Sequence, residues 1–213
     1  MDGQKPRMLT LPVEPMIVEP VTLEGQSVRL EPLSHDHYAD LCENVMGDDI
    51  WRWIFYPVKT TDEMHGFIET ALAYAAQGGV LPFATIYENR VVGTTRYLNI
   101  DKTHHTIEIG TTVIGKPWQR TVVNTEAKYL MLRHAFEVLG CLRVQFHTDE
   151  LNTASRNAIA RLGAQQDGII RNHRICLDGR VRNTVLFSIT DMEWLAVKKN
   201  LEGKLSQSNP VEN

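Results

Sequence analysis

Alternating apolar and polar positions mark one strand of this chain with particular clarity. Between Leu142 and Asp149, apolar side chains at Leu142, Val144 and Phe146 alternate with polar ones. Side chains that alternate in this way point to opposite faces of a strand. The pattern therefore predicts a strand with one buried face and one polar face.

A helical spacing follows a capping sequence near residue 60. Thr60 and Glu63 form a T-x-x-E capping box, in which each side chain bonds to the backbone of the other residue. Apolar residues then recur at intervals of three and four, at Met64, Phe67, Ile68, Ala71, Leu72 and Ala75. Gly78-Gly79 is a signal that ends a helix, so we expect one amphipathic helix between these signals.

The rest of the pattern divides into short strands and helices. Two hairpins are indicated, around Glu88-Asn89-Arg90 and around Asp178-Gly179. Further strands are expected over Val21–Leu33 with a break at Gly25-Gln26, Pro82–Tyr87, Val91–Leu98, Thr106–Ile114, Ile169–Leu177 and Val181–Ile189. Further helices are expected from Ser34 to about Met46, over Asn124–Leu139 and Thr153–Leu162, and from the capping box at Thr190–Glu193 to about Leu201.

These elements predict one α/β domain. A chain of 213 residues is the size of an ordinary single domain, and it shows no internal repeat. Residues 1–20 are rich in proline and lack a period, so we expect a flexible N-terminal arm there. Residues 21–202 form the expected domain, and the polar residues 203–213 are expected to be a flexible tail.

Composition and charge narrow the class of protein. A hydrophobic content of 43% and a charged content of 23% are typical of a soluble globular protein. The net charge of −4 argues against a protein that coats nucleic acid. No apolar run approaches the ~20 residues of a membrane span, and the N-terminus lacks a signal-peptide layout. Cys42, Cys141 and Cys176 form no CxxC pair, so we expect a reducing compartment, the cytoplasm.

The strand expected at Thr106–Ile114 places unusual residues on one face. Glu108, Gly110 and Thr112 point to the side opposite the apolar residues of the strand. A carboxylate beside a glycine and a threonine leaves open volume around the charge. Such an arrangement is unusual for a solvated face, and it indicates a pocket.

Two segments carry the most informative motifs. P-W-Q-R-T-V-V-N-T-E-A runs from Pro117 to Ala127, where free N–H groups at a helix N-terminus attract anions. N-T-A-S-R-N-A-I-A-R-L-G runs from Asn152 to Gly163. Together they resemble the acyl-CoA-binding half of the GNAT superfamily of N-acetyltransferases, in its RimJ/RimL-like branch. The order of elements over nearly all of residues 21–195 also matches that fold.

The resemblance implies both a fold and a reaction. The fold is α/β, with a mixed, mostly antiparallel twisted sheet of six to seven strands flanked by about four helices. The sheet is splayed between its two central strands, and a short C-terminal helix follows. The reaction is transfer of an acetyl group from acetyl-CoA, as co-substrate, to an amine acceptor by a monomer or homodimer. Because no metal-ligand spacing such as HxxxH appears, we expect no metal.

The donor site is carried over from the family pattern residue by residue. The backbones of Val113, Ile114 and Gly115 would pair with the pantetheine arm of the donor. The family's phosphate loop reads Q/R-x-x-G-x-G/A, and Gln119 and Asn124 fit it. The donor-binding residues implied by the two segments are Gln119, Arg120, Thr121, Val122, Val123, Asn124 and Thr125, with Asn152 and Ser155.

Arg120 and Val122 stand where this family has glycines, and two outcomes are open. Glycine allows close approach of backbone to phosphate and positive φ, which a β-branched valine does not adopt cheaply. In the first outcome the loop keeps a helix-like path, and Arg120 adds a charge for the phosphates. In the second outcome the site is weakened, or reshaped for another donor.

The resemblance also assigns roles in the reaction. Glu108 would accept the proton of the ammonium group, and Ser155 would protonate or hydrogen-bond the leaving thiolate. A backbone N–H near Val113–Gly115 would polarise the carbonyl. Many relatives use a tyrosine as the acid where this chain has Ile159. Two plainer interpretations remain, in which Asn152 and Ser155 cap a helix and Glu108 pairs with Arg96.

The acceptor side is expected around the densest aromatic segment, Trp51–Pro57. Core packing explains much of it, and Trp53 and Tyr56 are our candidates for lining the acceptor groove, with Arg96. An α-amino group with a pKa of about 7.7–8.0 is partly neutral at pH 7, whereas lysine with a pKa of about 10.4 is almost wholly charged. One base therefore suits a peptide N-terminus or a small amine of low pKa.

Two alternatives stay open at this point. The fold can serve another donor, such as a longer acyl-CoA or an aminoacyl-tRNA, and the residues Arg120 and Val122 motivate that hypothesis. The chain can also be a non-catalytic binding module of the same fold. Sequence does not identify the amine acceptor.

Overall fold

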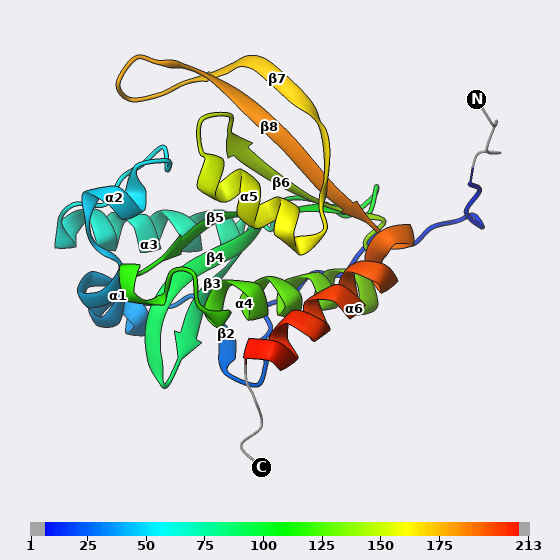
Figure 1. Ribbon diagram of the computed structural model, residues 1–213, viewed down its shortest axis with the longest axis horizontal. Coiled ribbons are helices and arrows are strands. Elements are labelled where there is room, and N and C mark those ends of the chain that lie inside the picture. The colour runs from blue at the N-terminus through cyan, green and yellow to red at the C-terminus, as the bar shows by residue number, and fades with distance from the viewer. Residues whose placement is uncertain (1–6, 209–213) are drawn as a thin grey trace.

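The computed structural model describes residues 7–208 (Figure 1). Residues 1–6 of the expected arm and residues 209–213 of the expected tail lie outside the described residues. The strands are β1 Leu23–Glu24, β2 Val28–Pro32, β3 Leu81–Tyr87, β4 Arg90–Asp101, β5 Thr106–Ile114, β6 Arg143–Asp149, β7 Gln165–Ile175 and β8 Val181–Thr190. The helices are α1 Tyr38–Val45, α2 Asp48–Trp51, α3 Thr61–Ala76, α4 Val122–Arg133, α5 Thr153–Leu162 and α6 Asp191–Ser208.

All eight strands join in one sheet, in the order β1-β2-β3-β4-β5-β6-β8-β7. Every neighbouring pair is antiparallel except β5 and β6, which are parallel. Only Thr106–Glu108 pair with Arg143–Gln145 there, and beyond these three pairs the two strands diverge. The expected mixed sheet, splayed between its central strands, is therefore confirmed.

Helices cover both faces of the sheet and divide the core in two. α1, α2 and α3 pack on Ala84, Ile86 and Val113 of the sheet in one cluster of buried residues. α4, α5 and α6 contribute to a larger cluster with Phe83 and Tyr97 on the other face. Figure 1 shows α4 and α6 lying side by side across that face. Both faces of the central strands are thus buried.

The sheet has more strands than expected because the first predicted strand is split in two. The turn at Gly25–Ser27 separates β1 from β2, and the carboxylate of Glu126 accepts hydrogen bonds from the backbone N–H groups of Gln26 (2.5 Å) and Ser27 (3.1 Å). Glu126 is itself buried, at 3% exposure. The break that sequence placed at Gly25-Gln26 is therefore confirmed, and α4 holds it.

Helix boundaries follow the predicted capping signals closely in two cases. Thr60 and Glu63 exchange the hydrogen bonds of a capping box at the start of α3. Gly163 ends α5 in a left-handed conformation, at a φ of 106°. The helix expected over Asn124–Leu139 ends where predicted, with α4 passing into a π-helical turn over His134–Val138, whereas α6 continues to Ser208 instead of ending near Leu201.

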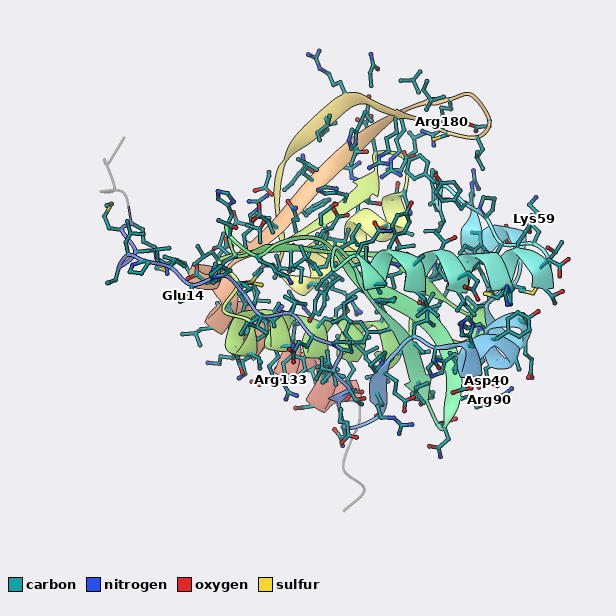
Figure 2. The ribbon with its side chains drawn as sticks, turned by 180° about the vertical axis from the view of Figure 1, so that it is seen from behind. Glu14, Asp40, Lys59, Arg90, Arg133 and Arg180 are labelled. Atoms are coloured by element: carbon teal, nitrogen blue, oxygen red, sulfur yellow. The ribbon has the colours of Figure 1, made fainter. Side chains whose placement is uncertain are left out.

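The described part of the N-terminal segment is anchored although it has no regular structure. Met16 is buried, its N–H donates to the carbonyl of Lys102 (2.9 Å), and the thiol of Cys141 contacts its sulfur at 3.5 Å. Nε2 of His105 hydrogen-bonds the carbonyl of Glu14 (2.8 Å). Figure 2 shows Glu14 at the opposite end of the molecule from Lys59. Across residues 7–208, none of the helices combines the length and apolarity that crossing a bilayer requires.

Candidate active site

A cleft of about 1140 Å³ opens where β5 and β6 diverge. Its walls come from the segment between α2 and α3, from α3, and from the start of α4 and the inner side of α5. β4, β5 and β6 form its floor, and β7 and β8 close one side. Ten residues that sequence named line it: Trp53, Tyr56, Arg96, Glu108, Ile114, Gln119, Arg120, Asn124, Asn152 and Ser155.

One edge of β5 is unpaired along the cleft. From Ile109 to Ile114 this strand pairs with β4 only, because β6 has already turned away. A bulge opposes Thr95 of β4 to two residues of β5, and Thr111 there adopts a φ of 45°. Positive φ is a genuine outlier for a β-branched residue, and bulges commonly redirect backbone groups beside active sites. The edge thus offers backbone hydrogen-bonding groups to a ligand.

The structure does not bring all three expected pantetheine-pairing residues to the cleft. Ile114 lines it, but its carbonyl already accepts a hydrogen bond from Nε2 of Gln119 (2.9 Å). Val113 is buried and pairs with Thr94, and the N–H of Gly115 donates to the carbonyl of Val92 (2.9 Å). The backbones of Val113 and Gly115 are therefore used in bonds to β4. The bulge near Thr111 lies closer than these two residues to the open edge of β5.

In the loop that lacks the family's glycines, one residue takes the backbone conformation that favours glycine. Arg120 takes the left-handed conformation, at a φ of 62°, and its side chain is exposed at the cleft. Thr121 caps α4 by accepting the N–H of Val123, and Val122 is the first helical residue. Valine thus follows the helical path of the first outcome expected from sequence, whereas Arg120 before it takes a left-handed conformation.

The other residues of this loop divide between the cleft and the core. Asn124 and Gln119 line the cleft. Val123 is fully buried in the core, and Thr125 accepts a hydrogen bond from Arg161 of α5 (2.7 Å). Thr121 and Val122 lie at the helix N-terminus without lining the cleft. Free N–H groups at this end of α4, together with Arg120, form a site suited to anions.

Glu108 is the buried carboxylate of the cleft. It is 5% exposed, and Oε2 accepts a hydrogen bond from Nδ2 of Asn99 (2.6 Å) and meets Nδ1 of His147 at 3.1 Å. A Cβ at Gly110 would lie 3.2 Å from Oε1 of Glu108, so glycine leaves room for that carboxylate. Burial raises the pKa of Glu108 to about 7, against hydrogen bonding from Asn99 that favours the charged form. Arg96 is not its partner.

His147 was not predicted as a site residue, although it lies on the polar face of a predicted strand. The β5–β6 register puts Gln145 beside Glu108, so His147 follows two residues later on the same face. Burial, together with His173 and nearby arginines, lowers the pKa of His147 to about 4. A neutral imidazole beside a carboxyl with a pKa of about 7 makes a pair that holds and passes a proton near neutral pH.

Asn152 and Ser155 meet at the start of α5. Oδ1 of Asn152 accepts the N–H of Ser155 (3.0 Å), so Asn152 is the cap of the helix, as the plainer interpretation proposed. Both residues also line the cleft, so the cap does not exclude contact with a ligand. Ile159 is buried and offers no acid.

Aromatic rings and arginines line the end of the cleft where sequence predicted the acceptor. Two guanidinium groups lie near the ring of Phe55, that of Arg174 at 5.2 Å and that of Arg182 at 5.0 Å from its centroid. The ring of Trp53 meets Arg180 at 6.0 Å. Arg180 lies near the tip of the β7–β8 hairpin (Figure 2), so these contacts join that hairpin to the segment after α2. The arginines were not among the predicted site residues.

Lys128 is a second group that sequence missed. It lies in α4, lines the cleft and is 5% exposed. Its Nζ donates to the hydroxyls of Thr112 (2.6 Å) and Thr95 (2.9 Å), on either side of the bulge. Burial lowers the pKa of Lys128 to about 7. Lys128 lies three residues before the buried Met131. This helical spacing was the signal that could have placed Lys128 on the inner face of α4.

Among the described side chains, one group has the arrangement of a possible metal site. His35, His65 and Glu69 bring their ligand atoms within 4.8 Å of one another. All three are exposed, and none lines the cleft. The cleft chemistry described above does not involve them.

Comparison with protein families gives one match. A family model described as "Acetyltransferase (GNAT) domain" matches residues 27–165, which include β2 to β6 and all of α5. No curated protein matches the chain.

Solved structures extend the match over the chain. A GCN5-related N-acetyltransferase from Brucella melitensis is 31% identical, with a TM-score of 0.85, over 92% of this chain and 90% of that chain. A chain from T. thermophilus is 34% identical, with a TM-score of 0.81, over 89% and 100%. Mycobacterium smegmatis RimJ, solved in complex with CoA-disulfide, is 20% identical, with a TM-score of 0.72, over 87% and 95%. At that identity the likeness to RimJ concerns the fold alone.

Proposed function

The chain belongs to the GNAT acetyltransferase family, and on that premise we propose that Glu108 is the general base and Ser155 the general acid of its reaction. The protein is an N-acetyltransferase, which transfers an acetyl group from acetyl-CoA to an amine. The observation that carries our assignment of the base is the burial of Glu108 in the cleft, with a pKa raised to about 7.

The residues around the cleft fit CoA. The unpaired edge of β5 suits an extended pantetheine arm, because its amide groups would pair as an added strand would. The N-terminus of α4 and the guanidinium of Arg120 suit phosphate groups. Gln119 and Asn124 line the same region. Acetyl-CoA supplies the acetyl group as an activated thioester.

Glu108 is suited to take the proton that the amine must lose. An ammonium group does not attack a carbonyl, so a base must accept its proton first. With a pKa of about 7, Glu108 is partly ionised at neutral pH, and its affinity for a proton is far higher than that of an ordinary carboxylate. His147 lies 3.1 Å from it and extends the path toward the rest of the cleft.

Ser155 is suited to the leaving group. As the new carbon–nitrogen bond forms and the carbon–sulfur bond breaks, the sulfur gains negative charge. The hydroxyl of Ser155, at the first turn of α5 in the cleft, is our candidate to donate a hydrogen bond or proton to it. Backbone N–H groups at the β5 bulge are our candidates to polarise the carbonyl.

For the acceptor we infer an amine of low pKa, in line with a RimJ/RimL-like enzyme that acts on protein N-termini or with one that acts on small amines. A single carboxylate base with a pKa of about 7 removes a proton from an α-ammonium, whose pKa is about 7.7–8.0, far more easily than from lysine. The free state of Cys42, Cys141 and Cys176 supports our proposal of a cytoplasmic enzyme.

The first test measures release of the CoA thiol from acetyl-CoA with a peptide amide that has a free N-terminus. Glu108→Gln is expected to lower kcat/KM by roughly 10²–10⁴. Because a base works only when deprotonated, kcat/KM of the wild type should rise with pH through about 7, and the variant should lose that limb. Ser155→Ala should lower kcat while the KM for acetyl-CoA stays close to that of the wild type.

Glu88→Gln is the matched control, because Glu88 is exposed in the β3–β4 turn. Folding of Glu108→Gln is checked by urea unfolding. Since the folded-state pKa of Glu108 is raised above 4.5, this carboxyl contributes stability that is lost as pH rises from about 4.5 to about 7, so the stability of the wild type relative to Glu108→Gln should fall over that range. An unchanged pH profile and rate in Glu108→Gln would remove Glu108 from the mechanism.

A further inference from the structure

Arg96 is a buried cation without a partner. Its exposed fraction is 9%, and its Nε and Nη2 atoms have no hydrogen-bond partner within residues 7–208. The remaining orphaned side-chain atom in this range is Nδ1 of His173, which also belongs to a residue of the cleft. Native proteins seldom leave buried polar groups unpaired, so orphaned donors beside a cavity point to a ligand.

Burial leaves the charge of Arg96 in place. Desolvation lowers its pKa only to about 10, so the guanidinium stays protonated at neutral pH. Its single close neighbour of note is the ring of Phe67 in α3, 5.0 Å from the guanidinium carbon. Stacking on a ring holds the fork flat and satisfies none of its N–H groups. An uncompensated buried charge is costly to the fold, and an anion would offset that cost.

The sheet register puts Arg96 beside the proposed base. Arg96 in β4 pairs with Gly110 in β5, and Leu98 pairs with Glu108. Paired residues point to the same face, so Arg96 and Glu108 are diagonal neighbours on the floor of the cleft. Gly110 contributes no side chain between them. A molecule whose amine lies at Glu108 therefore reaches Arg96 within a few bonds.

Other charges around the acceptor end favour an anion as well. The carboxylate of Asp149 is bound by Arg180 (2.7 Å) and lies near Arg182, and Glu108 is bound by Asn99 and His147. Among the described side chains, neither of these carboxylates lies within ion-pair distance of Arg96. Arg174 and Arg182 add positive charge at the cleft. The acceptor end is thus cationic in a chain of net charge −4.

We propose that Arg96 binds a carboxylate of the acceptor, so that the substrates are amines with a carboxylate a few bonds from the nitrogen. Peptides that begin with an acidic residue have this chemistry on an α-amine of low pKa, and free amino acids have it on an ammonium of higher pKa. The planar fork of arginine suits the two oxygens of a carboxylate. The inference rests on the proposed acetyl transfer and adds the class of acceptor.

The test compares pairs of acceptors that differ in a carboxylate, at matched concentrations of the neutral amine, because the ammonium of glycine has a higher pKa than that of glycinamide. Glycine is compared with glycinamide, and a peptide amide that begins with aspartate with one that begins with asparagine; the two pairs separate free amino acids from peptides. In at least one pair the carboxylate member should have a kcat/KM at least about tenfold higher. Arg96→Gln should lower kcat/KM for that member by about 10²-fold and leave its neutral partner within about threefold.

Arg90→Gln is the matched control, because Arg90 is exposed at the β3–β4 turn and pairs with Glu43, away from the cleft. Arg96→Lys keeps the charge and loses the fork, so it should recover part of the preference. Calorimetry with aspartate and with glycine gives a second readout that does not depend on turnover or on a mutant that folds. Binding of either to the wild type, with weaker binding of its amide, would support the inference.

Two results would overturn the inference without touching the proposed function. One is equal acetylation of both members of both pairs by the wild type. The other is an equal loss on both members in Arg96→Gln. Absence of thiol release with every amine, charged or neutral, would instead count against the proposed function. Absence of binding of both carboxylates in the calorimeter would then overturn the carboxylate site by itself.

Discussion

Arg120 occupies a backbone position that glycine adopts with less strain. A non-glycine residue in the left-handed region costs roughly 1–2 kcal/mol, and Arg120 holds a φ of 62°. The same residue carries an exposed guanidinium at the cleft, beside the N-terminus of α4. A cation at that point attracts phosphate groups. The backbone strain at Arg120 therefore lowers the stability of the fold, while its charge strengthens binding of the donor.

Two variants of Arg120 separate the effect of its charge from the effect of its backbone strain. Arg120→Gly and Arg120→Ala lose the same charge, so both should raise the KM for acetyl-CoA several-fold and weaken its dependence on salt. Arg120→Gly also relieves the strain, so its free energy of unfolding should be about 1 kcal/mol higher than that of Arg120→Ala. Urea unfolding and kinetics at two ionic strengths measure both effects. Equal stability of the two variants would contradict the role of φ.

Sequence predicted those site residues whose evidence is local. Glu108 was singled out because alternation along one strand fixes its face, and Asn152 because a short local motif resembles the family pattern at a helix start. His147 was missed because its contact with Glu108 depends on how β5 lies beside β6. Gly115 was expected at the donor, yet its N–H is taken by Val92 across the sheet. Register is a non-local property that one strand does not encode.

At the scale of elements, the β7–β8 hairpin and the segment after α2 act as a joined wall. The ring of Phe55 contacts Arg174 and Arg182, one from each strand of the hairpin. Cation–π contacts of this kind contribute about 0.5–2 kcal/mol each. Sequence found the hairpin and the aromatic segment, but not their contact. The contact positions the end of the cleft that we propose for the acceptor, without touching the loop at Gln119 and Arg120.

Loss of the contacts in this wall should therefore raise the KM for the amine and leave the KM for acetyl-CoA nearly unchanged. Phe55→Leu removes the ring that the guanidinium groups contact, so the KM for the amine should rise about three- to tenfold. The KM for acetyl-CoA in the same variant should stay within about twofold, which serves as an internal control. Phe55→Trp keeps an aromatic face and should restore the amine KM. A parallel rise of both KM values would show that the segment supports the whole fold instead.

At the scale of the whole molecule, the N-terminal segment belongs to the fold from about Glu14. Sequence predicted a flexible arm over residues 1–20, because proline-rich stretches without a period give no sign of packing. Met16 nevertheless fills the core beside Cys141 and hydrogen-bonds Lys102, on elements far away in the sequence. No local pattern surrounds a single buried methionine, so such an anchor escapes sequence reasoning.

The anchor is tested by two neighbouring substitutions. Met16 is 4% exposed and Ile17 is 76% exposed. Met16→Ala should lower the free energy of unfolding by about 2–4 kcal/mol, whereas Ile17→Ala should change it by less than about 0.5 kcal/mol. Thermal or urea unfolding measures both. Equal effects would mean that the segment contributes nothing specific to the core.

The three-pair junction between β5 and β6 has a consequence for how the molecule assembles. β1 to β5 come from residues 23–114, and β6 to β8 from residues 143–190, so each half of the sheet is continuous in sequence. The antiparallel pairs β1–β2, β3–β4, β4–β5 and β7–β8 close over short turns, whereas the junction is parallel and has α4 in its crossover. The halves can therefore form early and separately. Pairing of the two halves at this junction creates the core under α4 and the cleft together.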